Sequence, residues 1–420
     1  MMAEDGIIRV TRRHESGATN TFRITERPPV FVSGSGAELV TAEGQRFLDF
    51  VAGSSASALG YGHLAHRAAL ERAMAGGIFH TGTRLPSTFR AELYEKLANR
   101  LPKGLDCFQL ANSGAEAIEA AIKAAQFVTK RHGLVAFEGG YHGRTLGALS
   151  VTYGAHIRDP FSVMTDTVRF VPFPEAGQPA DMEALDRAMK DVKAAAVILE
   201  AVQGVNGVRI PPPGFLEEVR RLCTAHGALM VVDEIWNGFG RCGMWFGFET
   251  SGITPDLVVM GKALSSSLPL SCVAGPVSIL KAWPPGMHTS TFQGNPIACA
   301  MACAVIDTIR EDDLLGHVHN VIEPAFRAFA ANLDGAPGIA AVRVCGAQAA
   351  VAFTTPWGAP DAMRSVRLQQ EGLANGLLLY SGGSDGNCLM LVPPLVMTAS
   401  QLEEGLERII KLIAENGPSV

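Results

Sequence analysis

The sequence of 420 residues predicts an α/β protein, with a mainly parallel sheet of seven strands, helices on both faces of that sheet, and a smaller α+β region. Two observations predict this fold. Between about residues 65 and 305, short apolar runs alternate with longer amphipathic stretches, which is the pattern of strands joined by helices. Several of these runs end in polar or small residues, as strands do where they present active groups at their carboxyl ends.

The alternation gives each element an expected position. Strands are expected at residues 107–111, 134–138, 167–172, 194–202, 228–235, 257–261 and 271–275, and helices at 115–130, 181–189, 214–226, 297–310 and 399–416. Before them, extended pieces at 29–32 and 45–50 are separated by glycine turns. We therefore expect three parts: an N-terminal arm with part of a small domain (1–64), a large domain (65–305) and a C-terminal small domain (306–420).

The composition limits the classes of function. Hydrophobic residues make up 47% of the chain and charged residues only 18%, so we expect large buried interfaces and an oligomer. The net charge of −6, with no basic block, argues against a nucleic-acid-binding protein. The first residues do not resemble a signal peptide, no apolar stretch approaches about 20 residues, and the eight cysteines form no C-x-x-C pair. We expect a cytoplasmic protein without a metal site, disulfides or a membrane segment.

Lys262 stands directly after the apolar run 257–260 and Gly261, and small residues follow it. One interpretation is that its side chain extends from the end of the strand to water. The other is that the amine is desolvated at the strand end, where a lowered pKa makes it a nucleophile towards carbonyl groups. A carbonyl partner on such a lysine indicates pyridoxal phosphate, which in turn requires a phosphate site and a partner for the pyridine nitrogen.

Three other strand ends carry residues that fit these requirements. Ser113 and Glu116 have the spacing of a capping box, so residues 112–117 predict either an ordinary helix start or a phosphate site on free N–H groups. Asp233 follows an apolar run, where its carboxylate would either hold a protonated pyridine nitrogen or simply cap the strand in solvent. Tyr141, in a glycine-rich turn after residue 138, would either cover a planar ring or pack structurally.

Residues 238–243 match the pattern G-x-G-x-x-G after a strand, which a dinucleotide-binding site would also show. The residues that follow are aromatic and broken by glycine, so no helix is expected to meet a pyrophosphate there. A nicotinamide-dependent oxidoreductase therefore stays as a distant alternative.

Taken together, the motifs resemble those of the class III (omega-type) aminotransferases of pyridoxal-phosphate fold type I. The resemblance runs from about residue 28 to 415. It is carried by Asn-Ser-Gly-Ala-Glu-Ala (112–117), Tyr-His-Gly (141–143), Glu-Ala-Val-Gln-Gly (200–204), Val-Asp-Glu-Ile (232–235), Gly-Phe-Gly-Arg (238–241), Gly-Lys-Ala-Leu (261–264) and Thr-Phe-Gln-Gly-Asn-Pro (291–296).

The resemblance implies a role for each matching residue. Lys262 would form the Schiff base with the cofactor and move the proton, and Asp233 would pair with the pyridine nitrogen. Thr291 would reach the phosphate held by the neighbouring subunit of a homodimer, or of a tetramer built from dimers. The remaining cofactor contacts implied by the family are Ser113, Gly114 and Ala115 at the phosphate, Tyr141 and Ile235 on the two ring faces, and His142 and Glu200 nearby. The chain departs from the family at Ala201, where proline is usual, and at Trp236, where a glutamine usually contacts the ring hydroxyl.

Substrate binding is expected to differ from that of glutamate-using members of the family. Those members carry a carboxylate-binding arginine at the position of Met390 and a glutamate that gates it at the position of Val205. Losing both charges together leaves neither of them buried and unpaired. We therefore expect an amino group that is not adjacent to a carboxylate, as in a β-amino acid, an amine or an amino carbonyl compound, which exchanges its amino group with a keto acid. Arg23 and Arg84 are the candidates for binding any carboxylate. Aminomutases, racemases and decarboxylases of the same family stay as alternatives.

Overall fold

The computed structural model describes residues 4–161 and 166–419. Its centre is a seven-stranded sheet in the order β4-β10-β9-β8-β7-β5-β6. The strands are β4 (Cys107–Ala111), β5 (Gly133–Phe137), β6 (Val168–Val171), β7 (Ala194–Glu200), β8 (Leu229–Asp233), β9 (Leu257–Met260) and β10 (Ser271–Gly275). The strand β10 runs in the opposite direction to the other six, so it pairs antiparallel with both β4 and β9. All seven predicted strands are confirmed within three residues at each end.

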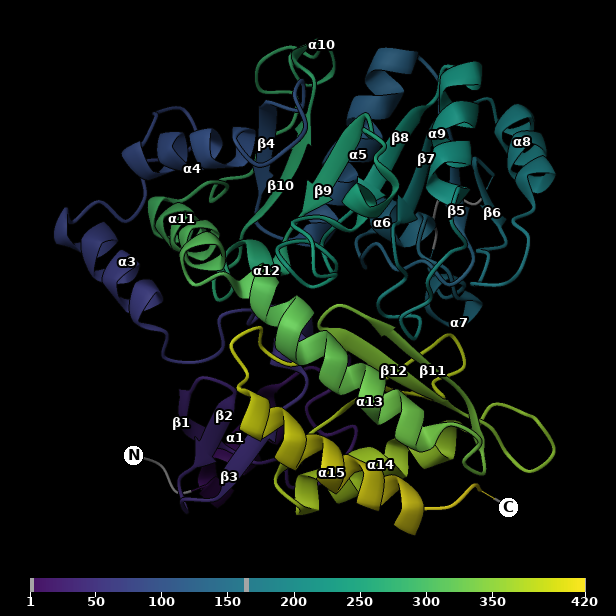
Figure 1. Ribbon diagram of the computed structural model, residues 1–420. Helices are drawn as coiled ribbons and strands as arrows, with labels where there is room; N and C mark the ends of the chain where they lie inside the picture. The colour runs from purple at the N-terminus through teal and green to yellow at the C-terminus, as the bar shows by residue number, and fades with distance from the viewer. Residues whose placement is uncertain (1–3, 162–165, 420) are drawn as a thin grey trace.

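The sheet is mainly parallel because helices cover both of its faces. Every residue of β5, β7 and β9 is buried, as expected for strands without a solvent face. Alternate strand residues belong to two separate apolar clusters, one of which contains α5 (Gly114–Thr129) and the other α9 (Phe215–His226). Figure 1 shows this large domain in the upper half of the view. The other helices between residues 52 and 311 are α2 (Ala52–Ser55), α3 (Leu64–Ala75), α4 (Thr88–Ala98), α6 (Leu146–Ser150), α7 (Ala155–Arg158), α8 (Met182–Asp191), α10 (Val277–Leu280) and α11 (Pro296–Glu311).

Below the large domain lie two four-stranded sheets and the C-terminal helices (Figure 1). The first sheet joins the two ends of the chain, since β3 pairs in parallel with β13. Its strands are β1 (Phe31–Ser35), β2 (Glu38–Thr41), β3 (Arg46–Asp49) and β13 (Leu377–Leu378), and the second sheet contains β11 (Ile339–Cys345), β12 (Gln348–Phe353), β14 (Tyr380–Gly382) and β15 (Cys388–Leu391). The helices are α12 (Leu314–His317), α13 (Glu323–Leu333), α14 (Ala362–Ala374) and α15 (Ala399–Glu415).

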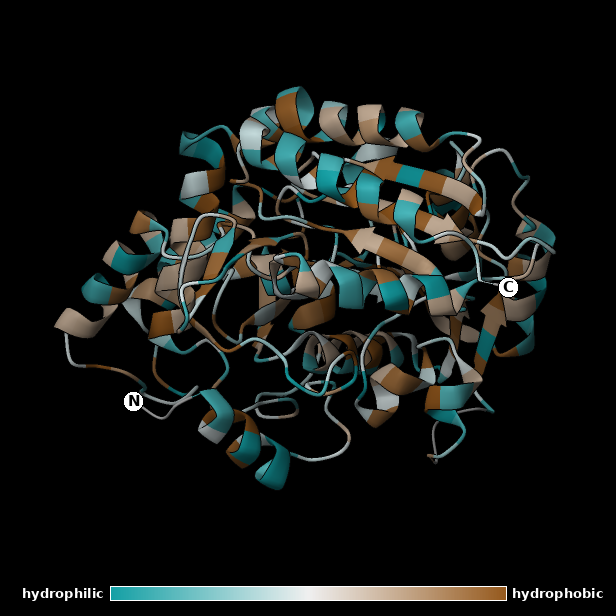
Figure 2. Ribbon diagram, turned by 90° about the horizontal axis from the view of Figure 1, so that it is seen from below, coloured by the Kyte–Doolittle hydropathy of each residue, from teal (hydrophilic) through white to brown (hydrophobic). Residues whose placement is uncertain are grey.

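Several helices lie where the sequence did not predict them, among them α1, α3 and α4. The expected extended arm begins with α1 (Glu4–His14), which buries none of its residues, and α3 and α4 precede the first strand of the large sheet. The strand arrows in Figure 2 are mostly brown (hydrophobic), whereas several of the helices show alternating teal and brown turns. No helix in the described part of the chain combines the length and apolar character that a membrane crossing requires.

Candidate active site

A cavity of about 290 Å³ lies at the carboxyl edge of the large sheet. Parallel strands present their C-terminal residues at one edge, so the residues that follow β4, β5, β7, β8 and β9 meet there. The cavity is lined by Gly114, Ala115, Tyr141, His142, Gly143, Arg144, Glu200, Val205, Asp233, Ile235, Trp236 and Lys262. The structure thus brings together nine residues proposed from the sequence, from five separate stretches of the chain.

Lys262 reaches this cavity from the end of β9. The strand is fully buried, and Lys262 itself has a positive φ of 44°, a conformation that is unfavourable for a non-glycine residue and is often found at functional sites. Its Nζ atom lies 3.9 Å from the centroid of the Trp236 ring, inside the site rather than in bulk solvent. Desolvation lowers the pKa of Lys262 to about 8, although the charges of Asp233 and Glu200 oppose this shift. Roughly a tenth of the amine is therefore neutral and nucleophilic at pH 7, far more than for an ordinary lysine.

Asp233 ends β8 and is fixed by two hydrogen bonds. One carboxylate oxygen accepts the backbone N–H of Ile235 at 2.9 Å, and the other lies 2.7 Å from Nδ1 of His142. Both side chains are buried. Burial alone would lower the pKa of His142, but the hydrogen bond and charge of Asp233 outweigh it and raise that pKa. The pair places a negative charge, supported by an imidazole, in the floor of the cavity.

Glu200 ends β7 and holds two loops of the site in place. Its carboxylate accepts the backbone N–H groups of Tyr141 at 3.0 Å and Gly204 at 3.1 Å. Burial raises the pKa of Glu200 to about 7, while the charge of His142 opposes that rise. Glu200 therefore positions the Tyr141 turn even though Ala201 replaces the proline that is usual in the family.

The helix α5 starts at the cavity with the predicted capping box. Ser113 Oγ accepts the N–H of Glu116 at 3.2 Å, and the Glu116 carboxylate accepts the N–H groups of Asn112 and Ser113. Gly114 and Ala115, one step further along, line the cavity at the positive end of the helix. A Cβ atom on Gly114 would lie 2.8 Å from Ile235, so the absence of a side chain here makes room for Ile235.

Five residues proposed from the sequence do not line this cavity, and the first of them, Ser113, caps α5 immediately before the lining residue Gly114. Thr291 is exposed on the loop before α11, and Arg84 is exposed before α4. Met390 is fully buried on β15, in an apolar cluster with Trp236. Arg23 lines a separate surface hollow formed by the N-terminal segment. Burial raises the pKa of Tyr380, and the charges of Arg23 and Arg144 oppose that rise.

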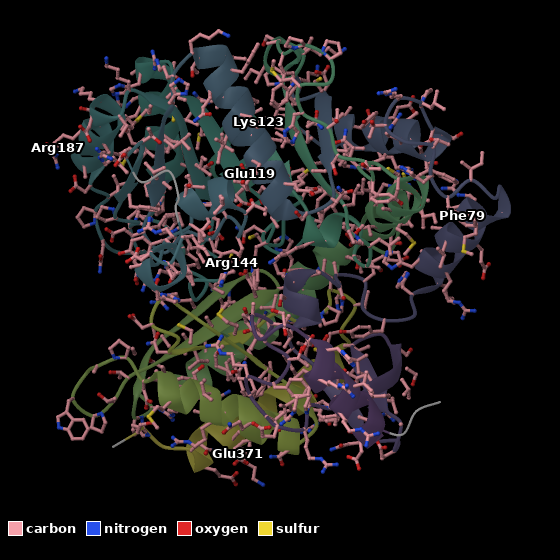
Figure 3. All side chains as sticks on the ribbon, turned by 180° about the vertical axis from the view of Figure 1, so that it is seen from behind. Phe79, Glu119, Lys123, Arg144, Arg187 and Glu371 are labelled. Atoms are coloured by element: carbon pink, nitrogen blue, oxygen red, sulfur yellow. The ribbon has the colours of Figure 1, made fainter. Side chains whose placement is uncertain are left out.

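Arg144 is the lining residue to which the sequence assigned no role. Figure 3 shows it where the large domain meets the small one. Its guanidinium carbon lies 5.7 Å from the centroid of the Tyr141 ring, and no ion pair holds it among the described residues. Its place in the glycine-rich turn of residues 139–145, three residues after Tyr141, was the only sequence signal. A free cation at the mouth of the cavity can bind an anionic group of a ligand.

The G-x-G-x-x-G stretch forms a tight turn and no nucleotide site. The N–H groups of Phe239 and Gly240 donate to the carbonyls of Trp245 and Met244, which closes the turn on itself. The side chain of Arg241 is buried beneath it. No helix of the kind that receives a pyrophosphate begins there, since only the short 3₁₀ segment Gly247–Ser251 follows.

Comparison with known proteins identifies the family of this chain. Residues 23–413 match the model of the family described as aminotransferase class-III. The chain belongs to the class III aminotransferases. Acetylornithine aminotransferase of Methanosarcina mazei is 36% identical to it over 380 residues, 90% of each protein. Diaminobutyrate--2-oxoglutarate aminotransferase of Haemophilus influenzae is 33% identical over 417 residues, 92% of this chain and 91% of that protein.

Solved structures agree with this class III fold. The ornithine aminotransferase of Toxoplasma gondii, described with pyridoxal phosphate at partial occupancy in its active site, has a TM-score of 0.87 and 28% identity, covering 99% of this chain and 95% of that one. A transaminase from the marine bacterium Virgibacillus has a TM-score of 0.90 at 22% identity, covering 97% and 98%, and shows the fold alone. The chain is an aminotransferase with pyridoxal phosphate as its cofactor, and the oxidoreductase alternative is wrong.

The residues of this class III site fit the cofactor. The cavity places an amine of lowered pKa, a buried carboxylate and the positive end of a helix around one space, which are the groups that a pyridoxal aldehyde, a pyridine nitrogen and a phosphate require. The Nε2 atom of His142 is buried without a partner, which leaves it available to a bound group or a water molecule. The cofactor, when bound, supplies an aldehyde for the lysine amine and a ring that accepts electron density from the substrate.

Proposed function

We propose that this aminotransferase takes an amino group that is remote from a carboxylate, with Lys262 as the catalytic amine and Arg144 as the cation for that carboxylate. The observation that carries the proposal is that Lys262 and Arg144 line the same cavity. Lys262 would bind the cofactor and then transfer the proton at the substrate carbon, while Asp233 would hold the pyridine nitrogen. Tyr141 and Ile235 would contact the two ring faces, with Ser113, Gly114 and Ala115 at the phosphate.

Two apolar residues support the expectation that this protein lacks the arginine that binds a carboxylate adjacent to the amino group. Met390 and Val205 both lie against Gly382: a Cβ atom there would be 2.9 Å from Met390 Cγ and 2.7 Å from the Val205 carbonyl oxygen. These two positions, where glutamate-using relatives carry a charged pair, are therefore neighbours here and are occupied by apolar residues. Trp236 belongs to the same apolar cluster. Acetylornithine and diaminobutyrate, for which two relatives are named, each carry an amino group that is remote from the carboxylate, and the second relative pairs its donor with 2-oxoglutarate.

A donor screen tests this proposal, with pyruvate as the common acceptor and 2-oxoglutarate as a second acceptor for every donor except glutamate. We expect a higher kcat/KM for N-acetylornithine, 2,4-diaminobutyrate, 4-aminobutyrate or β-alanine than for glutamate. Glutamate as the best donor would contradict the proposal. For Arg144→Leu, losing a charge-assisted hydrogen bond of about 1.5–3 kcal/mol predicts a fall in kcat/KM for 4-aminobutyrate of roughly 10- to 150-fold. Butylamine, which lacks the carboxylate, is the matched control and should react equally with both proteins.

We also propose a homodimer in which Thr291 reaches the partner's phosphate site. Large apolar side chains are exposed along residues 64–85 and 287–292, including Phe79 (52%) and Phe292 (62%), and a ring contact between His80 and Phe292 at 5.0 Å joins the two segments. Figure 3 shows Phe79 at the outer edge of the molecule. Such a continuous apolar surface beside Thr291 suits a second copy of the chain. A tetramer, the cytoplasmic location and the domain limits at residues 64 and 305 remain part of this proposal.

Phe292→Asp should convert the dimer into monomers, because it places a charge in the centre of the apolar surface. Sedimentation velocity at micromolar concentration measures the change, and cofactor should be lost with it. Thr291→Ala should keep the dimer but weaken cofactor binding by roughly 10- to 150-fold, the equivalent of one charge-assisted hydrogen bond. Trp357→Asp is the matched control, since Trp357 is 75% exposed on the small domain. A wild-type protein that is monomeric and fully active would contradict the shared site.

A further inference from the structure

Trp236 lies between the cavity and a buried polar cluster of the small domain. Its side chain is buried, its ring lines the cavity, and Lys262 Nζ lies 3.9 Å from the ring centroid. At this distance an ammonium group is attracted by the negative face of an indole, most strongly where water is excluded. The glutamine that the family usually has at this position offers no such face.

The indole ring is held in place by two contacts, one of which is itself fixed by a further hydrogen bond. Its Nε1–H donates to Oε1 of Gln348 at 2.9 Å, and Gln348 is a fully buried residue of β12. The amide of Gln348 in turn donates to Oδ1 of Asn237 at 3.2 Å, which fixes its own orientation. A Cβ atom on Gly204 would lie 2.2 Å from Cδ1 of Trp236, so the ring packs directly against that backbone. The orientation of the ring therefore depends on both the large and the small domain.

We propose that Trp236 is a positioning residue for Lys262 and that Gln348 positions Trp236. The indole face gives the free Lys262 amine one defined place beside the cavity, and the hydrogen bond from β12 keeps the face turned towards it. This inference rests on the proposed role of Lys262 as the catalytic amine. Through Trp236, Gln348 affects the geometry of the Lys262 amine although the two residues are more than 80 positions apart in the chain.

The pKa of Lys262 depends on the charged groups around it as well as on the indole face. Asp233 on β8 and Glu200 on β7 favour the ammonium form, His142 balances Asp233, and Arg241 in the turn after β8 disfavours it. The indole face also favours the ammonium form. Removing it should therefore lower the pKa of Lys262 further below its present value, and should let the side chain sample other positions.

The test follows the rate at which full-length protein, stripped of cofactor, captures added pyridoxal phosphate as a visible absorbance band. Borohydride reduction and peptide mass mapping confirm Lys262 as the attachment point. Because only the neutral amine reacts, the midpoint of the rate against pH reports the pKa of Lys262. We expect Trp236→Leu to lower the midpoint by about 0.4 to 1.5 pH units, Gln348→Leu to lower it less, and Trp236→Phe to restore more than half of the shift.

Holoenzyme kinetics supply the second measurement. Trp236→Leu should reduce kcat by roughly 10- to 100-fold with little change in KM, because a misplaced amine slows proton transfer more than substrate binding. Trp245→Leu is the matched control: that tryptophan also faces a cation, with Arg100 at 4.9 Å, but lies outside the cavity, so its midpoint and kcat should match wild type.

Two results would overturn the proposal: a Trp236→Leu midpoint equal to that of wild type, or a lower melting temperature as the only change. If Trp236→Leu does not fold, the midpoint of Gln348→Leu takes its place in the test, and a midpoint equal to that of wild type would overturn the proposal. A failure of the proposed function can be told apart from a failure of this inference. If a Lys262→Ala protein still formed the borohydride-reducible band, the role of Lys262 would be contradicted, independently of the result for Trp236.

Discussion

Replacing Lys262 with alanine should abolish transamination while leaving a folded protein. The amine lies in the cavity with a pKa lowered to about 8 and 3.9 Å from the centroid of the Trp236 ring, where it can act both as the nucleophile and as the base. Nucleophilic attachment and proton transfer both depend on it, so we expect kcat to fall by about 10⁴-fold or more. Steady-state rates with the best donor from the screen measure the loss. Lys281→Ala, at an exposed lysine beyond the sheet, should keep the wild-type rate.

The stability of Lys262→Ala relative to wild type, measured as a function of pH, should show that the Lys262 amine is desolvated. Below pH 8 Lys262 carries a charge in both the folded and the unfolded protein, and its burial opposes folding. As the pH rises from about 8 towards the ordinary value of 10.5, the folded protein loses this proton first and the opposition fades. The free energy of unfolding of Lys262→Ala, relative to wild type, should therefore decrease across that range. A difference that is independent of pH would show that the amine is not desolvated.

The strands were predictable because burial on both faces leaves a continuous apolar run in the sequence. In β7 and β9 each residue is buried, and the run ends at the polar residue that enters the site. The helix α3 carries no such signal: it buries only His66, Ala69 and Ala73, so its inner face is built from small residues and one histidine. The helix α1 buries nothing and has no apolar face packed in the core.

The candidate site was predictable where a residue's position on the sheet determines its environment. Asp233 and Lys262 follow adjacent strands, so their meeting follows from the topology alone. Arg144 could not be assigned in this way, because an arginine in a glycine-rich turn is usually solvated and only the tertiary structure places it over Tyr141. The orientation of Trp236 likewise depends on Gln348, and no local pattern connects two residues so far apart in the chain.

Asp233→Asn should reduce activity nearly as much as the loss of the lysine, although it replaces only one carboxylate oxygen with an NH₂ group. Both carboxylate oxygens face donors, the N–H of Ile235 and Nδ1 of His142. An asparagine has one acceptor oxygen, so with that oxygen on the Ile235 N–H its NH₂ group would face Nδ1 of His142, which could pair with it only after giving up its own proton there. The pyridine nitrogen would also lose its carboxylate partner. We expect kcat to fall by roughly 100-fold or more, since losing a charge-assisted contact of about 3 kcal/mol already corresponds to that factor.

The pH dependence of the stability of this variant distinguishes the effect of the Asp233 charge from the effect of its size and shape. Asp233 raises the pKa of His142 above its unfolded value, so the pair stabilises the folded protein fully below about pH 6.5, and this contribution is lost as the pH rises through the folded pKa. The stability difference between wild type and Asp233→Asn should accordingly be larger at pH 6 than above that folded pKa. Asp256→Asn is the matched control, because Asp256 pairs with Arg220 and the N–H of Met230 at the opposite end of β8. It should lower stability and leave kcat within about threefold of wild type, whereas an Asp233→Asn enzyme with wild-type kcat would show that the carboxylate has no part in the reaction.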